Sequence, residues 1–242
     1  MENHPNYVQE YFVRRSDVDP AGYLKPGALL RYAQQISMDQ CAALGFDDAF
    51  YAENHYAFLL AKQGLVFYRV PRYDETLTLI TMPEKTRRAS NRRITQVQDA
   101  AGNLVAEICS WWVMIDVQTR KILRGGCPAI DQYWNEQVDS AVTFRIPKAE
   151  ALEPKGVCTA NYTNCDTNRH INNCVYADIA CAAVPLDEVL QKPVRTMMVH
   201  YHREIPLGDS VALEAGRAED GWYVCGTRTS DGLLSFEAYC TL

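Results

Sequence analysis

The segment 165–178, CDTNRHINNCVYAD, concentrates side chains that can carry out chemistry. Asp166, Asn168 and His170 stand at alternate positions, just ahead of an apolar run. A carboxylate can act as a general base or a nucleophile, and an imidazole exchanges protons near neutral pH. Alternate residues of an extended segment share one face, so we expect the three side chains to converge. The spacing predicts a catalytic site; the competing interpretation is an ordinary turn of Asx residues with a surface histidine.

Two helices and two groups of strands are predicted around this segment. Apolar residues recur with helical spacing at 26–44 and at about 173–185, with Pro26 suited to a first turn and Gly45 to a stop. Asn172 or Asn173 would cap the second helix. Strand-like segments follow each helix, with hairpin turns at 99–103 and 230–232. The predicted strands are 64–69, 76–82, 92–99, 104–115, 196–204, 210–215, 222–229 and 233–241.

This order of elements occurs twice, which indicates an internal duplication. Three matches follow one another with separations of 147, 135 and 130 positions, so the second copy has shorter loops. The matches are 19–23 with 166–170, 70–74 with 205–209, and Gly102 with Gly232.

The two copies differ where the candidate chemistry lies. Asp19 stands opposite Asp166, but Ala21 and Tyr23 replace the amide and the imidazole. A fold that needed the polar trio for its shape would need it in both copies. The difference favours a site that works in the second half only.

At these residues the chain resembles the acyl-acyl carrier protein thioesterases of plants and bacteria. Residues 166–176, D-T-N-R-H-I-N-N-C-V-Y, follow that family's D-x-N-x-H-V-N-N-x-x-Y. Similar blocks occur at 87–93, 110–122 and 202–204, so the resemblance covers most of the chain. It implies an α+β fold of two tandem hot-dog domains, each an antiparallel sheet wrapped around one long helix. We place an acyl-binding domain at 1–124, a linker at 125–156 and a catalytic domain at 157–242.

The resemblance also implies a reaction, hydrolysis of the thioester of fatty acyl-acyl carrier protein with release of a free fatty acid. Asp166 would act either as the base on water or as the nucleophile. Asn168 would hold the carbonyl or the water, and His170 would exchange protons. Backbone N–H groups at the start of the second helix would face the oxyanion. The rival is a hot-dog enzyme acting on acyl-coenzyme A, either a thioesterase or a dehydratase. A non-catalytic acyl-binding module is a further alternative, but it would be expected to have lost the polar trio in both halves.

Glu204 is the fourth catalytic candidate, because the family has a glutamate at this place. If 196–204 is one strand, His200, His202 and Glu204 share a face. With the separation of 135, Arg69 takes the equivalent first-half position, so this carboxylate too belongs to the second half alone. The histidine pair could suggest a metal, but an i, i+2 pair is a weak signal and no metal or organic cofactor is expected.

A cysteine nucleophile is the alternative to carboxylate chemistry. Many plant members of the family carry a cysteine directly after the glutamate, but here Ile205 follows it. Cys165 and Cys174 flank the candidate site and are expected to be small buried apolar residues. The nine cysteines are scattered singly, without a C-x-x-C pair, which is typical of reduced thiols in the cytoplasm.

The stretch 85–93 gathers five positive charges and no acid in a chain of net charge −6. Composition alone would make it a solvated hairpin. Acyl carrier proteins are strongly acidic, and the family uses basic surface residues to hold them, so we expect this stretch to bind the carrier protein rather than nucleic acid. The residues are Lys85, Arg87, Arg88, Arg92 and Arg93.

The remaining features exclude several classes of protein. No apolar run approaches the roughly 18 residues that span a bilayer, and the first ten residues contain no apolar signal region. Glycine-rich phosphate loops and the G-x-S-x-G motif of serine hydrolases are absent. A homodimer is possible.

Overall fold

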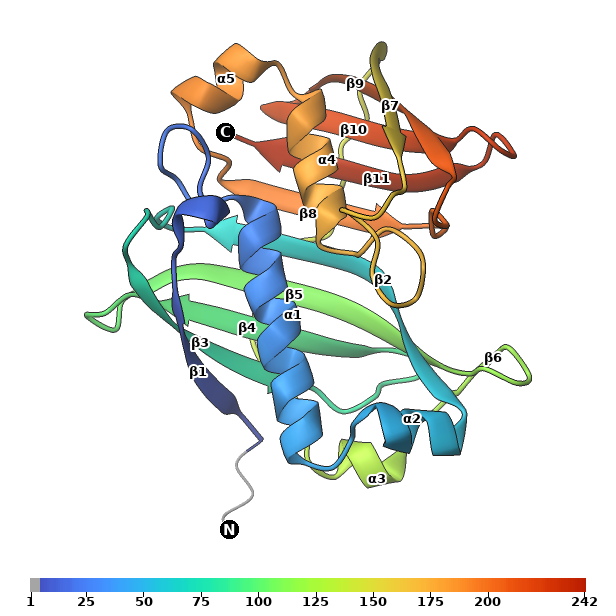
Figure 1. Cartoon of the computed structure of the whole chain (residues 1–242). Coiled ribbons are helices and arrows are strands. Elements are labelled where there is room, and N and C mark those ends of the chain that lie inside the picture. The colour runs from blue at the N-terminus through green and yellow to red at the C-terminus, as the bar shows by residue number, and fades with distance from the viewer. Residues whose placement is uncertain (1–4) are drawn as a thin grey trace.

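The computed structural model describes residues 5–242 and is built on one antiparallel sheet of eleven strands (Figure 1). The path across the sheet is β1-β3-β4-β5-β2-β8-β11-β10-β9-β7, and β6 pairs only with β5. The first-half strands are β1 (Tyr7–Phe12), β2 (Tyr56–Phe67), β3 (Thr76–Pro83), β4 (Asn91–Gln98), β5 (Leu104–Asp116) and β6 (Lys121–Ile122). The second-half strands are β7 (Glu153–Thr159), β8 (Thr196–Tyr201), β9 (Ser210–Ala218), β10 (Gly221–Arg228) and β11 (Leu234–Thr241).

The strand order is the same in both halves when it is read from the outer edge inward. β1, β3, β4, β5 and β2 correspond to β7, β9, β10, β11 and β8. The halves meet where β2 pairs with β8, from Lys62 opposite His200 to Val66 opposite Thr196. This symmetry supports the duplication inferred from the sequence, and the architecture is that of two tandem hot-dog units joined edge to edge.

One main helix covers each half, on the same face of the sheet, and the second-half helix is shorter than the long helix expected there (Figure 1). α1 (Pro26–Ala43) begins at a proline and packs Leu29 and Ile36 against the sheet, as its apolar spacing predicts. α4 (Val175–Ala183) starts after Asn172, whose side chain accepts the N–H of Cys174. The predicted helices are thus confirmed, but the expected asparagine cap is wrong, because the N-cap of α4 is Cys174, and Asn172 accepts a hydrogen bond from it two residues earlier.

The two helices touch near their N-terminal ends. Gly27 permits this approach, because a Cβ at that position would lie 2.2 Å from Asp178 Oδ1. Arg31 of α1 then pairs with Asp178 of α4 at 2.8 Å. The first half therefore positions the start of the second helix, which follows the candidate catalytic segment directly.

Shorter helices lie around the ends of this pair. α2 (Asp48–Asn54) and α3 (Pro128–Asp131) lie near the C-terminal end of α1, and α5 (Leu186–Gln191) follows α4 (Figure 1). A 3-10 turn at Arg15–Asp17 precedes α1. Over residues 5–242, the structure contains no helix with both the length and the apolar character needed to cross a membrane.

The structure departs from the predicted elements at several places. β1, β7 and the short helices were not predicted, and β2 begins at Tyr56 rather than at 64. The predicted linker 125–156 is not wholly irregular, since it contains α3, buries Ile130 and Trp134, and ends inside β7. β8 ends at Tyr201, so 202–204 lies beyond the strand and the expected alternation to Glu204 is wrong.

Candidate active site

The candidate catalytic segment forms a tight turn. The N–H of Asp166 donates to the His170 carbonyl at 3.1 Å, and Arg169 N–H donates back to the Asp166 carbonyl at 3.0 Å. Oδ1 of Asp166 accepts the N–H of Asn168 at 2.9 Å. Arg169 adopts the left-handed conformation, with φ of 62°. The expectation of an extended segment was therefore wrong, and it is this turn that gathers the side chains.

The first half contains the same turn. Asp19 Oδ1 accepts the N–H of Ala21 at 2.9 Å, and the N–H of Asp19 donates to the Tyr23 carbonyl at 2.8 Å. Gly22, with φ of 83°, takes the place of Arg169. The backbone of the site is thus repeated while its side chains are not. Since the same carboxylate-capped turn forms without the imidazole, the turn does not need His170 for its shape.

Hydrogen bonds also correct the alignment of the two copies. Leu24 N–H donates to the Pro71 carbonyl, and Ile171 N–H donates to the Ile205 carbonyl, so the separation here is 134 rather than 135. Val70, not Arg69, is then equivalent to Glu204. The first half still has no carboxylate at this place.

His170 lies between two carboxylates. Its Nδ1 is 3.9 Å from Asp166 Oδ1, and its Nε2 is 3.9 Å from Glu204 Oε2. Nδ1 is 3.1 Å from the Ile171 carbonyl oxygen. If Nδ1 carries the proton and donates it to this carbonyl, Nε2 is unprotonated and its lone pair faces Glu204. An imidazolium formed at His170 would have negative charge on both sides. The Glu204 side chain is 67% exposed, whereas those of Asp166 and His170 are about one-fifth exposed.

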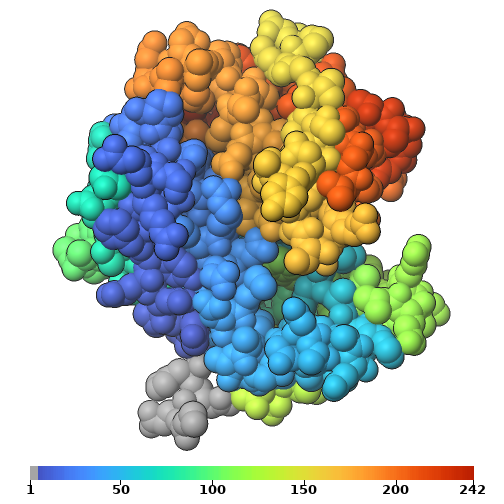
Figure 2. All heavy atoms as spheres, viewed as in Figure 1, coloured from blue at the N-terminus to red at the C-terminus, as the bar shows by residue number. Residues whose placement is uncertain are grey.

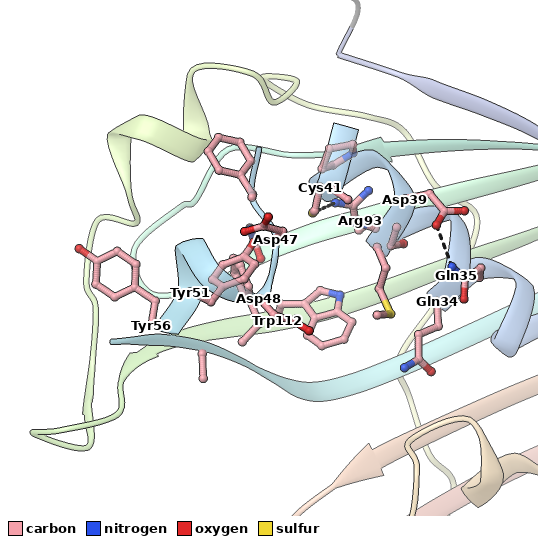
Figure 3. Close-up of a pocket in the computed structure, with 18 of the residues that line it drawn as sticks. Gln34, Gln35, Asp39, Cys41, Asp47, Asp48, Tyr51, Tyr56, Arg93 and Trp112 are labelled. Atoms are coloured by element: carbon pink, nitrogen blue, oxygen red, sulfur yellow. Dashed lines mark hydrogen bonds between the residues drawn. The ribbon is translucent and has the colours of Figure 1, made fainter. Parts of the chain in front are cut away.

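A cleft of 590 Å³ opens beside this turn. Its walls come mainly from α1, α2, β2, β4 and β5, and Figure 3 shows Gln34, Tyr51 and Trp112 around it. The second half contributes Asp166, Asn168 and Asn173, whereas His170 and Glu204 do not line it. The surface is visibly hollowed between α1 and the segment leading to α4 (Figure 2). The structure thus places a carboxylate and a carboxamide from one half at the mouth of a cavity built by the other.

Family models cover both halves of the chain. The N-terminal domain of acyl-ACP thioesterases matches residues 4–125, and the C-terminal domain matches residues 153–230. The chain belongs to the acyl-ACP thioesterase family.

Two plant members of the family are similar over most of this chain. An oleoyl-acyl carrier protein thioesterase of Arabidopsis thaliana is 21% identical over 87% of this chain and 63% of its own length. An acyl-[acyl-carrier-protein] hydrolase of Cuphea viscosissima is 22% identical over 79% of this chain and 49% of its own. The chain therefore spans about half to two thirds of the length of the curated relatives it matches.

Solved acyl-ACP thioesterase structures share the fold. The enzyme from Bacteroides thetaiotaomicron superposes with a TM-score of 0.86 and 22% identity, covering 98% of this chain and 97% of the other. The 12:0-ACP thioesterase from Umbellularia californica superposes with a TM-score of 0.80 and 14% identity, covering 98% and 96%. Both likenesses extend across the two halves, as expected for tandem hot-dog units.

In this member of the acyl-ACP thioesterase family, the N–H groups at the start of α4 are partly occupied. Cys174 N–H donates to Asn172 Oδ1, and Val175 N–H donates to the Asn172 carbonyl. These two donors are therefore not free for an oxyanion. The exposed amide of Asn168, which lines the cleft, is the better-placed donor.

The two flanking cysteines are poorly suited to nucleophilic chemistry. Cys174 is buried and donates its thiol to Gln34 Oε1 at 2.9 Å. Burial raises the pKa of the Cys174 thiol to about 12. Burial also raises the pKa of Cys165, and the neighbouring Asp166 carboxylate adds to the effect. Because the thiolate is the reactive form, both shifts favour a carboxylate mechanism.

His200, in β8, and His202, just beyond its end, have other partners. His200 Nε2 lies 2.9 Å from the Phe144 carbonyl, and His202 Nε2 lies 2.9 Å from Glu237 Oε2. Within residues 5–242, no three His, Cys, Asp or Glu side chains are grouped as metal ligands. The structure therefore does not bring His200 and His202 to His170.

The five basic residues have very different surroundings. Arg87 and Arg88 are exposed at the β3–β4 turn, with Arg87 donating to the Glu136 carbonyl at 2.7 Å. Lys85 pairs with Glu136. Arg92 is held by Glu84, through Nε to Oε2 at 2.9 Å and Nη2 to Oε1 at 2.6 Å.

Arg92 and Arg93 are therefore poor docking residues. Burial alone would raise the pKa of Glu84, but the bonds from Arg92 and the Val138 N–H outweigh it and lower the pKa. Removing Arg92 would leave a buried carboxylate unpaired. Arg93 is only 9% exposed and lines the cleft, so it does not fit the expected surface role.

Several cleft residues were not singled out in the sequence. They come from α2 and from the predicted linker, and include Asp47, Tyr51 and Trp134. Asp47 accepts the N–H of Phe50 as a helix cap, so D-D-A-F-Y at 47–51 did carry a helix-start signal. No local sequence pattern predicts that Trp134 packs near the C-terminal end of α1.

Proposed function

We propose that this chain hydrolyses the thioester of fatty acyl-acyl carrier protein and releases the free fatty acid. The observation that carries the proposal is the meeting of Asp166 and Asn168 with a largely apolar cleft built by the first half. The cleft would take the acyl chain, while the two polar side chains would face its carbonyl. Family membership supports the same reaction.

Two routes through Asp166 fit this geometry. As a base, the carboxylate takes a proton from water, the oxygen attacks the carbonyl carbon, and the carbon–sulfur bond breaks as the thiolate leaves and is protonated. As a nucleophile, it forms an anhydride and expels the thiolate, and water then opens the anhydride to give the fatty acid and restore the carboxylate. In either route, Asn168 can donate to the developing oxyanion.

His170 and Glu204, which do not line the cleft, would assist Asp166 from outside it. His170 is close enough to influence the carboxylate electrostatically, and Glu204 lies on its other side. We propose that His170 exchanges protons through Nε2, the nitrogen left free on the side of Glu204, since an imidazole does this near neutral pH. No metal or organic cofactor enters this scheme.

The second candidate is hydrolysis of acyl-coenzyme A. The exposed Arg87 and Arg88 favour the carrier protein, because their turn joins Pro83 and Asn91, which both line the cleft. Turnover of carrier-protein and coenzyme A thioesters of the same acyl chain should be compared. We expect kcat/KM to be at least about 10-fold higher for the carrier protein, because of complementary charge. A higher value for coenzyme A would reverse the assignment.

We also propose a cytoplasmic protein. All nine cysteines are free, which suits a reducing compartment. Fractionation of cells that express the protein would test the location. A homodimer is the proposed larger assembly, and sedimentation of the purified chain measures it directly.

Charge reversal at the β3–β4 turn should weaken carrier docking. For Arg87→Glu combined with Arg88→Glu, we expect KM for the carrier-protein substrate to rise about 10-fold at low salt and its salt dependence to fall. Small thioesters should be hydrolysed at nearly the normal rate. The matched control is Arg14→Glu with Lys192→Glu, two exposed charges on other elements. Equal losses on both kinds of substrate would show that the turn is structural.

Acyl-chain length should respond to residues of α1. Ala33 is a natural candidate because it is buried, but it lines a hollow of only 20 Å³, about enough for one water. Ser37 lines both this hollow and the main cleft. Ser37→Leu should therefore shorten the preferred chain without abolishing turnover, whereas Ala33→Leu should change it little. The profile of released fatty acids measures both, and an unchanged profile for Ser37→Leu would argue against binding in the first half.

A further inference from the structure

Arg93 is a buried cation in the wall of the cleft. It lies on β4, and Figure 3 shows it next to Cys41 of α1. Its Nη1 donates to Gln40 Oε1 at 2.5 Å and to Thr81 Oγ1 at 3.0 Å, and its Nη2 donates to Cys41 Sγ at 3.7 Å. The guanidinium also lies 5.4 Å from the ring centroid of Trp134. All of these partners can be neutral.

Among residues 5–242, no carboxylate balances this charge. Within the part of the chain that the structure describes, Arg93 forms no ion pair, although its neighbour Arg92 pairs with Glu84. Burial lowers the pKa of Arg93, which reflects the cost of holding the charge away from water. A guanidinium nevertheless stays protonated in proteins, so the cost persists unless an acceptor approaches. Asp39, Asp47 and Asp48 also line the cleft, but none of them forms an ion pair with Arg93.

A second donor in the same wall has no acceptor among the described residues. Trp134 is 5% exposed and lines the cleft, and its indole N–H has no hydrogen-bond partner among residues 5–242. A buried N–H without an acceptor is costly and uncommon. Arg93 and Trp134 together form a pair of donors, one of them charged, in the wall of the cleft.

This pair lies away from the catalytic turn. Gln34 of α1 accepts the thiol of Cys174, which marks the end of the cleft near Asp166. Gln40, which holds Arg93, is six residues further along α1, about 9 Å at 1.5 Å per residue. An acyl chain whose thioester lies at Asp166 would bring its distal carbons to Arg93.

We propose that the preferred acyl chain carries an oxygen acceptor in its distal part, such as a hydroxyl, keto or carboxylate group, and that Arg93 donates to it. Arg93 is then a specificity residue of the proposed thioesterase, and this inference rests on that function. An unsubstituted hydrocarbon would cover the guanidinium and the indole N–H without bonding to them. A hydrogen bond from a charged donor to a buried ligand oxygen discriminates by about 10- to 100-fold.

The test compares acyl chains of equal length on the carrier protein, one unsubstituted, one with a terminal hydroxyl and one with a terminal carboxylate. For the unmutated protein, we expect kcat/KM to be at least about 10-fold higher for one of the oxygenated substrates than for the unsubstituted one. Preference for the hydroxyl identifies a neutral acceptor, and preference for the carboxylate identifies an ion pair. Equal or faster turnover of the unsubstituted chain would overturn the proposal.

Arg93→Met provides the decisive comparison, because it keeps length and apolar volume. It should remove the preference by slowing only the oxygenated substrate, whereas a preference that survives would assign the selectivity elsewhere. If Arg93 instead only ties α1 to the sheet, Arg93→Met should slow all substrates alike. Should this variant fail to fold, Trp134→Phe removes the second donor without touching the cation, and we expect it to reduce the preference several-fold. An unchanged preference in Trp134→Phe would then count against the proposal.

A binding measurement separates this inference from the proposed function. Calorimetry with free fatty acids needs no turnover, and the hydroxylated acid should bind at least about 10-fold more tightly than its unsubstituted counterpart. If the protein shows this binding preference but does not hydrolyse the thioesters, the proposed thioesterase function is rejected and the role of Arg93 is kept. Hydrolysis without any binding preference would reject the role of Arg93 alone.

Discussion

Asp166→Asn should lower kcat by about 10²–10⁴-fold while the protein stays folded. The amide has the shape of the carboxylate, and its oxygen can still accept the N–H of Asn168 that closes the turn. It cannot take a proton from water or form an anhydride. Steady-state kinetics with an acyl-carrier-protein substrate, alongside thermal unfolding, measures the two expectations separately.

The structure supplies a matched control in Asp19→Asn. Asp19 closes the same turn in the first half, where Ala21 and Tyr23 stand at the places of Asn168 and His170. We expect both variants to change stability to a similar small extent and only Asp166→Asn to lose activity. Cys165→Ala and Cys174→Ala should be mild. An active Asp166→Asn variant together with an inactive Cys165→Ala variant would show that the nucleophile is a cysteine thiolate and not the carboxylate.

His170→Ala should cost about as much as the aspartate substitution, about 10²–10⁴-fold in kcat, because it removes the imidazole that we propose exchanges protons beside Asp166. Glu204→Gln should cost less, since that side chain is largely exposed and 3.9 Å from the imidazole. Added imidazole should restore part of the rate to His170→Ala, which a purely structural role would not allow. His55→Asn, an exposed substitution at the end of α2, is the control. Full activity of His170→Ala would remove the imidazole from the mechanism.

The regular elements could be predicted because their residues carry strong local patterns. α1 has a proline at its start and apolar residues on one face, and β3, β4 and β5 were placed within one or two residues. β1 and β7 were missed because both are edge strands with many exposed positions, so their apolar pattern is weak. The left-handed Arg169 could not be foreseen, since that conformation usually belongs to glycine, as at Gly22.

The candidate site was predictable in part. Asp166, Asn168, His170 and Glu204 do lie near one another, but their order around the cleft depends on a turn and on where β8 ends. The basic stretch shows the limit of composition more clearly. The fold places the five basic residues in different surroundings: Arg88 is exposed on the turn, whereas Arg93 is buried inside the cleft. Nothing in the spacing of the charges encodes that difference.

The central pairing of β2 with β8 bears on how such a chain could assemble from smaller parts. Each half, taken alone, would expose the full edge of one of these strands, and an exposed edge readily pairs with another. The pairing is antiparallel, so two copies of one half could satisfy each other through the same strand about a twofold axis. A separately produced second half is therefore expected to self-associate into a symmetric sheet. Such a pair would carry two copies of the turn at Asp166 and no first-half cleft, so both copies would lack the cavity that Asp166 faces in the intact chain.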